Sequence, residues 1–180
     1  MNIRSIDDVV IRTAANGDKE KIVALVFSIL AEYGLQSDPE NRDADLNDIE
    51  GNYIRRGGLF DLIEDGEGNL LGTVGLFPVS RDVCELRKMY FIRQARGIGL
   101  GRFVLERTAN CAQEIGFKTI VLETASVLKE AIRLYTQFGF TTFNSPHLAA
   151  RCDQAYILEL TERNSLSKSK AESNILLPLK

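Results

Sequence analysis

The chain is poor in the residues that build metal sites and disulfide frameworks. It has one histidine and three cysteines in 180 residues. A histidine-rich metal site is therefore excluded, and Cys84, Cys111 and Cys152 are odd in number and lack the short paired spacing of a zinc knuckle. A nucleophilic pair of His147 and Cys152 would need a third, orienting group that we cannot identify. We expect reduced thiols and no bound metal.

Long apolar runs are absent as well. The longest near-apolar run, residues 22–31, has about half the length that crosses a bilayer, and its apolar residues recur at helical spacing. It is typical of a core helix. Asp7 and Asp8 stand where a secretory signal needs apolar residues. We therefore expect a cytoplasmic protein with no membrane partner.

Positive charge is slightly outnumbered by negative charge overall and is concentrated in one segment. The chain carries 22 Lys and Arg against 25 Asp and Glu, a net charge of −3. Residues 85–107 hold six of these bases and two Glu, or +4, which leaves −7 for the rest. The basic segment is short and stacking aromatic residues are scarce, so we expect no nucleic acid partner.

Length and composition favour one domain. With 44% hydrophobic residues the chain can bury a sizeable core, and we assign residues 1–162 to a single domain. Residues 163–174 are rich in Ser and Lys and are typical of a solvated tail, so we assign 163–180 to a flexible C-terminal segment. Its apolar end, residues 175–179, either docks on the domain or a second copy, or is a terminal remnant.

Hydrophobic periodicity predicts alternating strands and helices. Gly34 should stop a first helix, Gly116 a third, and Ser126 should cap a fourth that runs to Phe138. The acid-rich residues 38–50 predict a second, more exposed helix. Strands are expected at residues 9–11, 59–63, 70–79, 83–92, 119–122 and 155–160.

A glycine-rich turn between a strand and a helix is the most informative segment. Glycines let the backbone approach a ligand closely, and the free N–H groups at the start of a helix favour an anion such as phosphate. A dinucleotide-binding fingerprint fails because Arg102 stands at the position of its last glycine. A phosphate-binding Walker A loop fails because no lysine follows a glycine in this turn.

The turn instead resembles the pyrophosphate loop of one superfamily. Residues 96–101, RGIGLG, are similar to the R/Q-x-x-G-x-G/A loop of the GNAT superfamily of acetyl-CoA-dependent N-acetyltransferases, and residues 131–140, AIRLYTQFGF, resemble its A-x-x-L-Y-x-x-x-G-F helix end. The resemblance covers about residues 83–140. It implies an α/β (α+β) fold with a mixed, mostly antiparallel sheet of six or seven strands flanked by helices, in a family whose members are often homodimers.

The same resemblance implies how acetyl-CoA, as co-substrate, would be bound. Backbone N–H groups would hold the pyrophosphate, Arg96 would add charge-assisted bonds, and the Phe91 N–H would stabilise the thioester oxyanion. Arg102 either adds a further charge-assisted bond or is a solvated helix residue. Arg93 replaces a proline, and Leu128 replaces an asparagine, that many relatives carry. The expected cofactor-binding residues are Phe91, Ile92, Arg96, Gly97, Ile98, Gly99, Leu100, Gly101 and Arg102.

Two residues are expected to move protons. Tyr135 matches the family tyrosine that often protonates the leaving thiolate, with a packed helix tyrosine as the alternative. Glu85 is the expected base, and Glu123 or water is the alternative. Either carboxylate could equally form a salt bridge with Arg87 or Lys88.

The resemblance implies N-acetylation of a primary amine on a small molecule. Acetylation of a protein or peptide and a non-catalytic acyl-CoA-binding module remain alternatives. If the acidic segment 38–50 forms part of the acceptor site, a cationic amine is mildly preferred through charge complementarity. The simpler interpretation of that segment is a solvated acidic helix.

Overall fold

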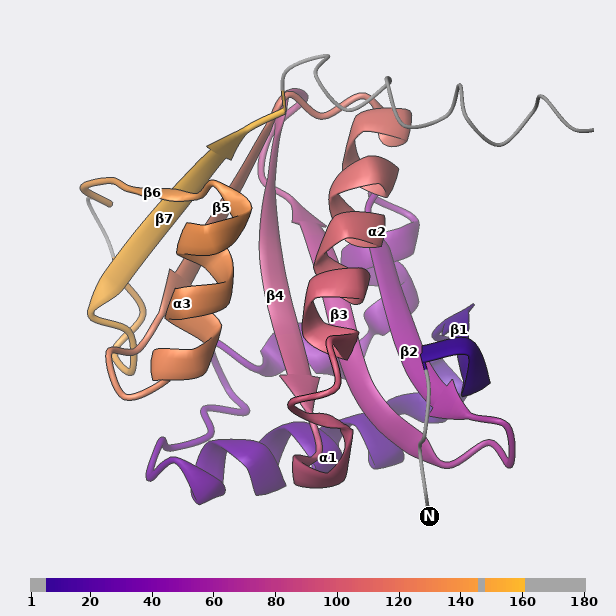
Figure 1. Ribbon diagram of the computed structural model, residues 1–180. Helices are drawn as coiled ribbons and strands as arrows, with labels where there is room; N and C mark the ends of the chain where they lie inside the picture. Colours follow the sequence, from indigo (N-terminus) through magenta and orange to yellow (C-terminus); the bar gives the residue numbers. More distant parts are fainter. Residues whose placement is uncertain (1–5, 146–147, 161–180) are drawn as a thin grey trace, which may run out of the picture.

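The computed structural model describes residues 6–145 and 148–160, which form one seven-stranded sheet with helices on both faces (Figure 1). The strands lie in the order β1-β2-β3-β4-β5-β7-β6, and every neighbouring pair is antiparallel except β4 and β5. The predicted mixed, mostly antiparallel sheet is confirmed. The predicted tail at 163–180 and His147 lie outside the described residues.

The elements follow one another in the order that periodicity predicts. The strands are β1 Val9–Thr13, β2 Leu59–Asp65, β3 Leu70–Pro78, β4 Val83–Phe91, β5 Thr119–Thr124, β6 Thr141–Thr142 and β7 Gln154–Glu159. The α-helices are α1 Lys19–Glu32, α2 Leu100–Ile115 and α3 Lys129–Phe138. Short 3-10 or π turns are η1 Ile6–Asp8, η2 Asn16–Asp18, η3 Ala44–Asn47, η4 Glu50–Ile54 and η5 Arg93–Ala95. None of the helices in the described part of the chain is both long and apolar enough to cross a bilayer.

The parallel pair β4 and β5 separates after three residues. Pairing runs from Val83 opposite Thr119 to Glu85 opposite Val121, and both strands then continue without pairing to each other. Strand β7 stays paired with β5 along its whole length, so it is β4 that loses its partner. In Figure 1 the two strands meet near the top and diverge downward, which opens the sheet between them.

A β-bulge distorts β4 beside this opening. The register between β3 and β4 shifts by one residue between Thr73 and Gly75, and Lys88 adopts a left-handed conformation with φ +53°. The Thr73 hydroxyl donates a 2.6 Å hydrogen bond to the Lys88 carbonyl. A bulge adds one residue to a strand and changes the direction of its side chains. Here the Lys88 side chain is buried, although lysine is normally exposed.

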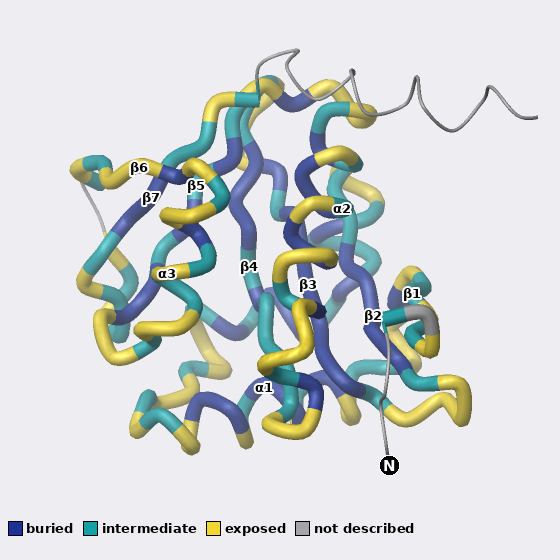
Figure 2. The backbone as a smooth tube through the Cα atoms, in the orientation of Figure 1, coloured by how far each residue is buried: buried dark blue, intermediate teal, exposed yellow. Residues whose placement is uncertain are grey.

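Two hydrophobic clusters cover opposite faces of the sheet. One contains the apolar faces of α2 and α3, from Leu100 and Val104 to Tyr135, and the other contains α1, Leu46 and Ile49. The central strands β2 and β3 are dark blue along most of their length in Figure 2 because both faces are covered.

The acid-rich segment 38–50 is not one exposed helix, and that prediction is wrong. It forms turns, the 3-10 helix η3 and the start of the π turn η4. Asp43 and Asp45 are both buried. Because these side chains are two residues apart, a regular helix would point them to opposite sides, so burying both requires an irregular backbone.

Two further details differ from the prediction. Helix α3 begins at Lys129 after Leu128, so Ser126 is not its cap; the Ser126 N–H instead donates a 2.7 Å hydrogen bond to Asp153. The two-residue strand β6 was not predicted, since it is too short for any periodicity.

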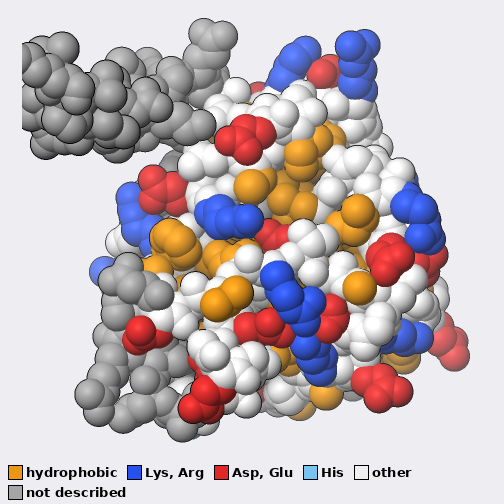
Figure 3. Space-filling view, turned by 90° about the vertical axis from the view of Figure 1, so that its right-hand side faces the viewer, with side chains coloured by type: hydrophobic (Ala, Val, Ile, Leu, Met, Phe, Trp, Pro, Cys, Tyr) orange, Lys and Arg blue, Asp and Glu red, His pale blue; other side chains and the backbone are white. Residues whose placement is uncertain are grey.

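Charges of both signs are interspersed with hydrophobic side chains on the face that Figure 3 shows. Near the β1 edge of the sheet, Arg12 bridges Asp18 at 2.8 Å and Glu64 at 2.9 Å, and Lys21 also contacts Glu64 at 2.9 Å. The charges on this edge are therefore neutralised by neighbours of opposite sign.

Candidate active site

A cavity of about 420 Å³ passes through the opening between β4 and β5. Its walls come from both faces of the sheet: Ile29 of α1 and the following Tyr33 on one face, and Gly101, Leu134 and Tyr135 of α2 and α3 on the other. A volume of this size is typical of sites for small ligands.

The predicted glycine turn borders this cavity and leaves a row of amides free. Gly97 and Gly99 have φ +80° and +85°, which glycine adopts without strain. None of the six consecutive backbone N–H groups at residues 97–102 donates a hydrogen bond to the described residues. The last three of them begin helix α2, whose dipole places partial positive charge there. The turn can therefore bind an anion through its backbone.

Gly101 is needed for close packing rather than for its backbone angles. A Cβ atom at this position would lie 3.3 Å from Leu134 Cδ2 and 3.9 Å from Phe91 Cε2. The glycine therefore lets the start of α2 approach α3 at the cavity wall. Ile98 and Leu100, also expected to bind the cofactor, do not border the cavity with their side chains, but their N–H groups belong to the free row.

Arg96 holds the turn in place through hydrogen bonds to Phe91 and to the end of α1. Its Nε donates a 2.7 Å bond to the Phe91 carbonyl, and its two Nη atoms donate bonds of 2.8 and 2.9 Å to Glu32. Nη1 also donates to the Tyr33 hydroxyl at 3.0 Å. The hydrogen bonds with Glu32 raise the pKa of Arg96. Both Arg96 and Arg102 border the cavity, but Arg102 has no partner among the described residues and its side chain is exposed.

The Phe91 amide points into the opening. Ile92 donates its N–H to the Leu71 carbonyl on β3 at 2.9 Å. Because donors alternate between the two sides of an antiparallel strand, the N–H of the preceding residue, Phe91, points away from β3. Phe91 is therefore positioned to donate to a ligand, whereas the Ile92 amide is already used and Ile92 does not border the cavity.

Tyr135 lies on the same cavity. It is 7% exposed and packs against Phe140 with a ring-centroid distance of 5.7 Å. Burial raises the pKa of Tyr135 well above its ordinary value. Its hydroxyl has no hydrogen-bond partner among the described residues. A buried phenol that stays protonated can donate a proton to a group in the cavity.

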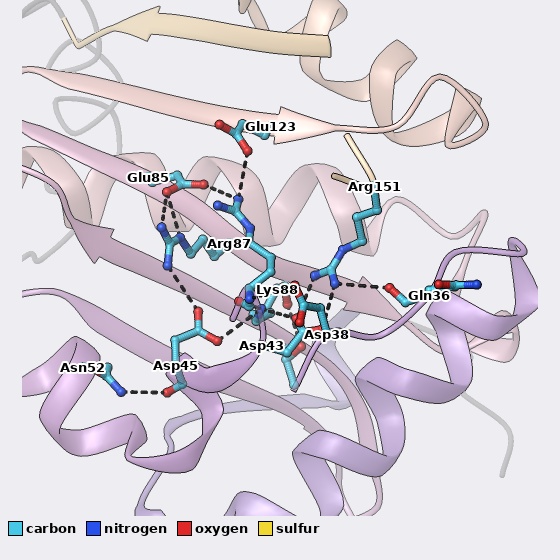
Figure 4. Close-up of polar contacts among 12 residues, drawn as sticks. Gln36, Asp38, Asp43, Asp45, Asn52, Glu85, Arg87, Lys88, Glu123 and Arg151 are labelled. Carbon is cyan, nitrogen blue, oxygen red and sulfur yellow. Dashed lines mark hydrogen bonds and ion pairs between the residues drawn. The ribbon is translucent and has the colours of Figure 1, made fainter. Parts of the chain in front are cut away.

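The two candidate bases have different surroundings. Glu85 is buried and does not border the cavity; its carboxylate accepts bonds from Arg42 and, at 2.8 and 2.5 Å, from Arg87. The expected alternative of a salt bridge with Arg87 is therefore present. Glu123 does border the cavity, where its Oε2 accepts the Ala149 N–H at 3.1 Å and lies 3.5 Å from Arg42 (Figure 4).

Sequence reasoning missed a buried ionic cluster next to these glutamates. Lys88 contacts Asp43 at 2.5 Å and Asp45 at 3.2 Å, and Arg151 donates two 2.7 Å bonds to Asp43 (Figure 4). Burial acts to raise the pKa of Asp43, but Arg151 and Lys88 outweigh it and hold that pKa below its ordinary range. Tyr53 donates a 2.6 Å bond to Asp45. The signal was the complementary charge of segments 38–50 and 85–107.

Three other expected features have clear positions. Arg93, which replaces a proline, begins η5 with an exposed side chain 3.5 Å from Glu32. Leu128, which replaces an asparagine, borders the cavity with an apolar side chain. Cys152 also borders it, and burial raises the pKa of its thiol, which disfavours a nucleophilic thiolate. The described residues contain no group of three potential metal ligands.

Comparisons with known proteins agree with this geometry. The family model for the acetyltransferase (GNAT) family matches residues 24–140. The uncharacterized N-acetyltransferase YjgM of Escherichia coli K12 is 37% identical over 136 residues, which cover 73% of this chain and 81% of YjgM. A Staphylococcus aureus GNAT acetyltransferase structure has a TM-score of 0.79 at 24% identity and covers 85% of this chain and 99% of its own.

A structure of yncA, a putative acetyltransferase from Salmonella typhimurium with its cofactor acetyl-CoA, has a TM-score of 0.67 at 21% identity and covers 86% of this chain and 95% of its own. The family match and the relatives, together with this fold, establish the family of the chain. The chain belongs to the GNAT acetyltransferase family and is an acetyl-CoA-dependent acyltransferase.

Proposed function

We propose that this enzyme moves the acetyl group of acetyl-CoA to a primary amine of a small molecule, by direct attack of the amine on the thioester. One observation carries this proposal: a single cavity joins a row of free backbone amides to a charged wall through the opening between β4 and β5. The charged wall consists of Arg42, Arg87, Lys88, Glu123 and Arg151. The amides provide a site for phosphate, and the charged wall provides a site for a polar acceptor.

The backbone amides at residues 97–102 would hold the pyrophosphate, with Arg102 adding a charge-assisted bond. The unpaired edge of β4 would hold the pantetheine arm, and the Phe91 N–H would stabilise the oxyanion that develops at the thioester carbonyl. A donor of this kind is worth about 3 kcal/mol in the transition state. Arg96 contributes by holding the turn, because Glu32, Tyr33 and Phe91 occupy its guanidinium.

Tyr135 is the proposed general acid. When the new C–N bond forms, the C–S bond breaks and the departing sulfur takes the proton of the Tyr135 hydroxyl. The nitrogen loses its remaining extra proton to solvent, and Tyr135 regains a proton from solvent. Its raised pKa keeps the phenol protonated at neutral pH. A thiol with a pKa of about 8.5 is a tolerable leaving group, so the acid accelerates the reaction without being indispensable.

Glu123 is the better placed of the two candidate bases. An ammonium substrate must lose a proton before it attacks, and only a carboxylate that reaches the cavity can accept it directly or through one water. Glu123 meets this condition. Glu85 accepts bonds from two guanidinium groups away from the cavity, and we assign it the positioning of Arg42 and Arg87.

A small acceptor is favoured over a peptide by how the cavity is bounded. Arg151 precedes β7 and binds both Asp43 and the Gln36 carbonyl of the segment after α1, at 2.7 and 3.3 Å. This bridge joins two loops at the charged wall of the cavity. An extended peptide would need an open groove at that place.

The proposal is tested by incubating the protein with acetyl-CoA and a panel of amines while free thiol release is followed. Thiol release that depends on a small amine, with the acetylated amine identified by mass spectrometry, is the expected result. Tight acetyl-CoA binding without thiol release from any amine would contradict it and favour the non-catalytic module. Release with peptides alone would favour the peptide N-acetyltransferase. A cytoplasmic location and a homodimer stay predictions, the latter testable by sedimentation.

A further inference from the structure

The charged wall of the cavity presents mainly cations, contrary to the preference for a cationic acceptor drawn from the acidic segment. Asp43, Asp45 and Glu85 do not border the cavity, and Glu123 is the one carboxylate of this cluster that does. All four bases of the ionic cluster border the cavity, namely Arg42, Arg87, Lys88 and Arg151.

Three of these four bases are occupied by the protein itself. Lys88 contacts Asp43, Asp45 and the Arg42 carbonyl at 2.5, 3.2 and 3.1 Å. Arg87 binds Glu85, approaches Asp45 at 3.4 Å, and its guanidinium carbon lies 3.9 Å from the Phe77 ring centroid. Both Nη atoms of Arg151 donate hydrogen bonds to Asp43. These side chains have few donors left for a ligand.

Arg42 is different. Its Nη2 makes both of its contacts, the bond to Glu85 and the 3.5 Å approach to Glu123, while Nε and Nη1 have no hydrogen bond to the described residues. The side chain is only 20% exposed. Donors of a largely buried guanidinium are normally satisfied, and a carboxylate is the group that best matches them.

Glu123 offers the opposite charge beside these donors. Its Oε2 accepts the Ala149 N–H, while Oε1 has no hydrogen bond to the described residues. The cavity therefore presents a free acceptor and free guanidinium donors on side chains that approach within 3.5 Å of each other. This pattern matches a ligand that carries an ammonium and a carboxylate close together.

The charge of the whole cluster supports the same ligand. Four bases balance four acids, namely Arg42, Arg87, Lys88 and Arg151 against Asp43, Asp45, Glu85 and Glu123. An ammonium and a carboxylate together add no net charge to this balance. A polyamine or a simple dicarboxylate would add charge that the largely buried cluster does not compensate.

We propose, on the basis of the proposed acetyl transfer, that the acceptor is an α-amino acid. Arg42 binds the carboxylate of the amino acid through the free guanidinium donors. Glu123 binds the ammonium group and accepts one of its protons. The neutral amine then attacks the thioester carbon, the C–S bond breaks and Tyr135 protonates the sulfur. The second proton of the nitrogen passes to solvent, from which Tyr135 is reprotonated. Arg42 is therefore a specificity-determining residue, and it distinguishes an amino acid from an amine that lacks the carboxylate.

The test uses matched sets of three acceptors with the wild-type protein: the common α-amino acids, their α-amides, and the corresponding decarboxylated amines. Thiol release from acetyl-CoA should have a kcat/KM at least about tenfold higher for one or more amino acids than for the matching amide and amine, which corresponds to about 1.4 kcal/mol. Equal or better release with the amide or the amine would overturn the inference and leave the proposed function intact. No release from any amine would overturn both.

Variants separate a specific role of Arg42 from a structural one. Arg42→Gln should bring the ratio of kcat/KM for acid over amide close to one, and Arg42→Lys should restore part of it. Because the ratio is measured within one variant, a lower folded fraction cancels. Arg55→Gln, on an exposed arginine paired with Asp48 at 2.8 Å, is the control and should keep the wild-type ratio. An unchanged ratio in Arg42→Gln would refute the assignment.

Discussion

Asp43 and Arg151, 108 residues apart in the chain, form a two-bond ion pair in which each Nη atom lies 2.7 Å from a carboxylate oxygen. The same carboxylate receives Lys88 from β4 at 2.5 Å. Asp43 therefore connects the segment after α1, the bulged strand and the loop before β7. These are the elements that surround the charged wall of the cavity.

Replacing Asp43 with Asn should strongly destabilise the protein. The Asp43 side chain is fully buried, and its loss leaves Lys88 and Arg151 without their shared partner. Breaking a buried pair in this way costs about 3–5 kcal/mol, measurable by urea denaturation at pH 7. Asp48→Asn removes an exposed pair with Arg55 and should change the midpoint little. Equal effects of the two substitutions would contradict the role of Asp43.

The destabilisation caused by Asp43→Asn should also depend on pH. The pKa of Asp43 is lower in the folded protein than in the unfolded chain, so its contribution is complete above the unfolded value of about 3.9 and is lost as the pH falls below it. The difference in unfolding free energy between wild type and variant should therefore be constant from pH 5 to 8 and shrink below pH 4. A difference that shrinks between pH 6 and 8 would exclude Asp43 as its source.

Replacing Tyr135 with Phe should lower kcat by about 100-fold and leave CoA binding unchanged, because the variant loses a proton donor but keeps the ring packing. Since burial raises the pKa of Tyr135, the wild-type rate should show no loss from its ionisation up to pH 10. Tyr156→Phe is the control: Tyr156 is buried, donates to Gln154 at 2.7 Å and does not border the cavity. An unchanged kcat in Tyr135→Phe would remove it from the mechanism.

The two arginines of the glycine turn should respond differently to substitution. Arg102→Gln should raise the Kd for CoA by about tenfold without changing stability, because Arg102 is exposed and unpaired among the described residues. Arg96→Gln should lower stability as well as affinity, because it breaks the bridge to Glu32. Arg133→Gln, on the exposed side of α3, is the matched control for both measurements, calorimetry with CoA and thermal unfolding.

Replacing the two glutamates separates the base from the positioning residue. Glu123→Gln should lower kcat/KM by about 100-fold, most at low pH, where the amine is an ammonium and its proton must be removed. Glu85→Gln should lower stability, because Arg42 and Arg87 lose their shared partner, yet keep the shape of the wild-type pH profile. A changed profile in Glu85→Gln with a normal one in Glu123→Gln would reverse the two roles.

The parts of the fold that the sequence predicts well have strong local signals. The apolar repeat of α1 with Gly34 after it, and the helix between the glycine turn and Gly116, occupy the predicted positions. The conformation of the glycine turn was predictable for the same reason, since positive φ at Gly97 and Gly99 and the free helix amides follow from six adjacent residues.

The opposite charges of segments 38–50 and 85–107 hinted at the charged wall, but its pairing was not predictable because it depends on contacts between distant segments. Acids in segment 38–50 are typical of a solvated helix, and only the sheet brings Lys88 and Arg151 against Asp43. For the same reason Arg96 suggested a phosphate ligand, whereas its partner Glu32 lies 64 residues away. Whether an arginine binds a ligand or the protein is decided by tertiary structure.

The most direct test of the account is calorimetry with CoA on the wild type and on matched glycine variants. Gly97 has φ +80° and Gly57 has φ +84°, and a Cβ atom added to either glycine would have no neighbouring atom within 4 Å, so alanine strains both alike. If the amides at residues 97–102 bind the pyrophosphate, Gly97→Ala should weaken CoA binding by at least about tenfold while Gly57→Ala binds as the wild type does. No heat with the wild type, or equal affinity in Gly97→Ala, would contradict pyrophosphate binding by these amides.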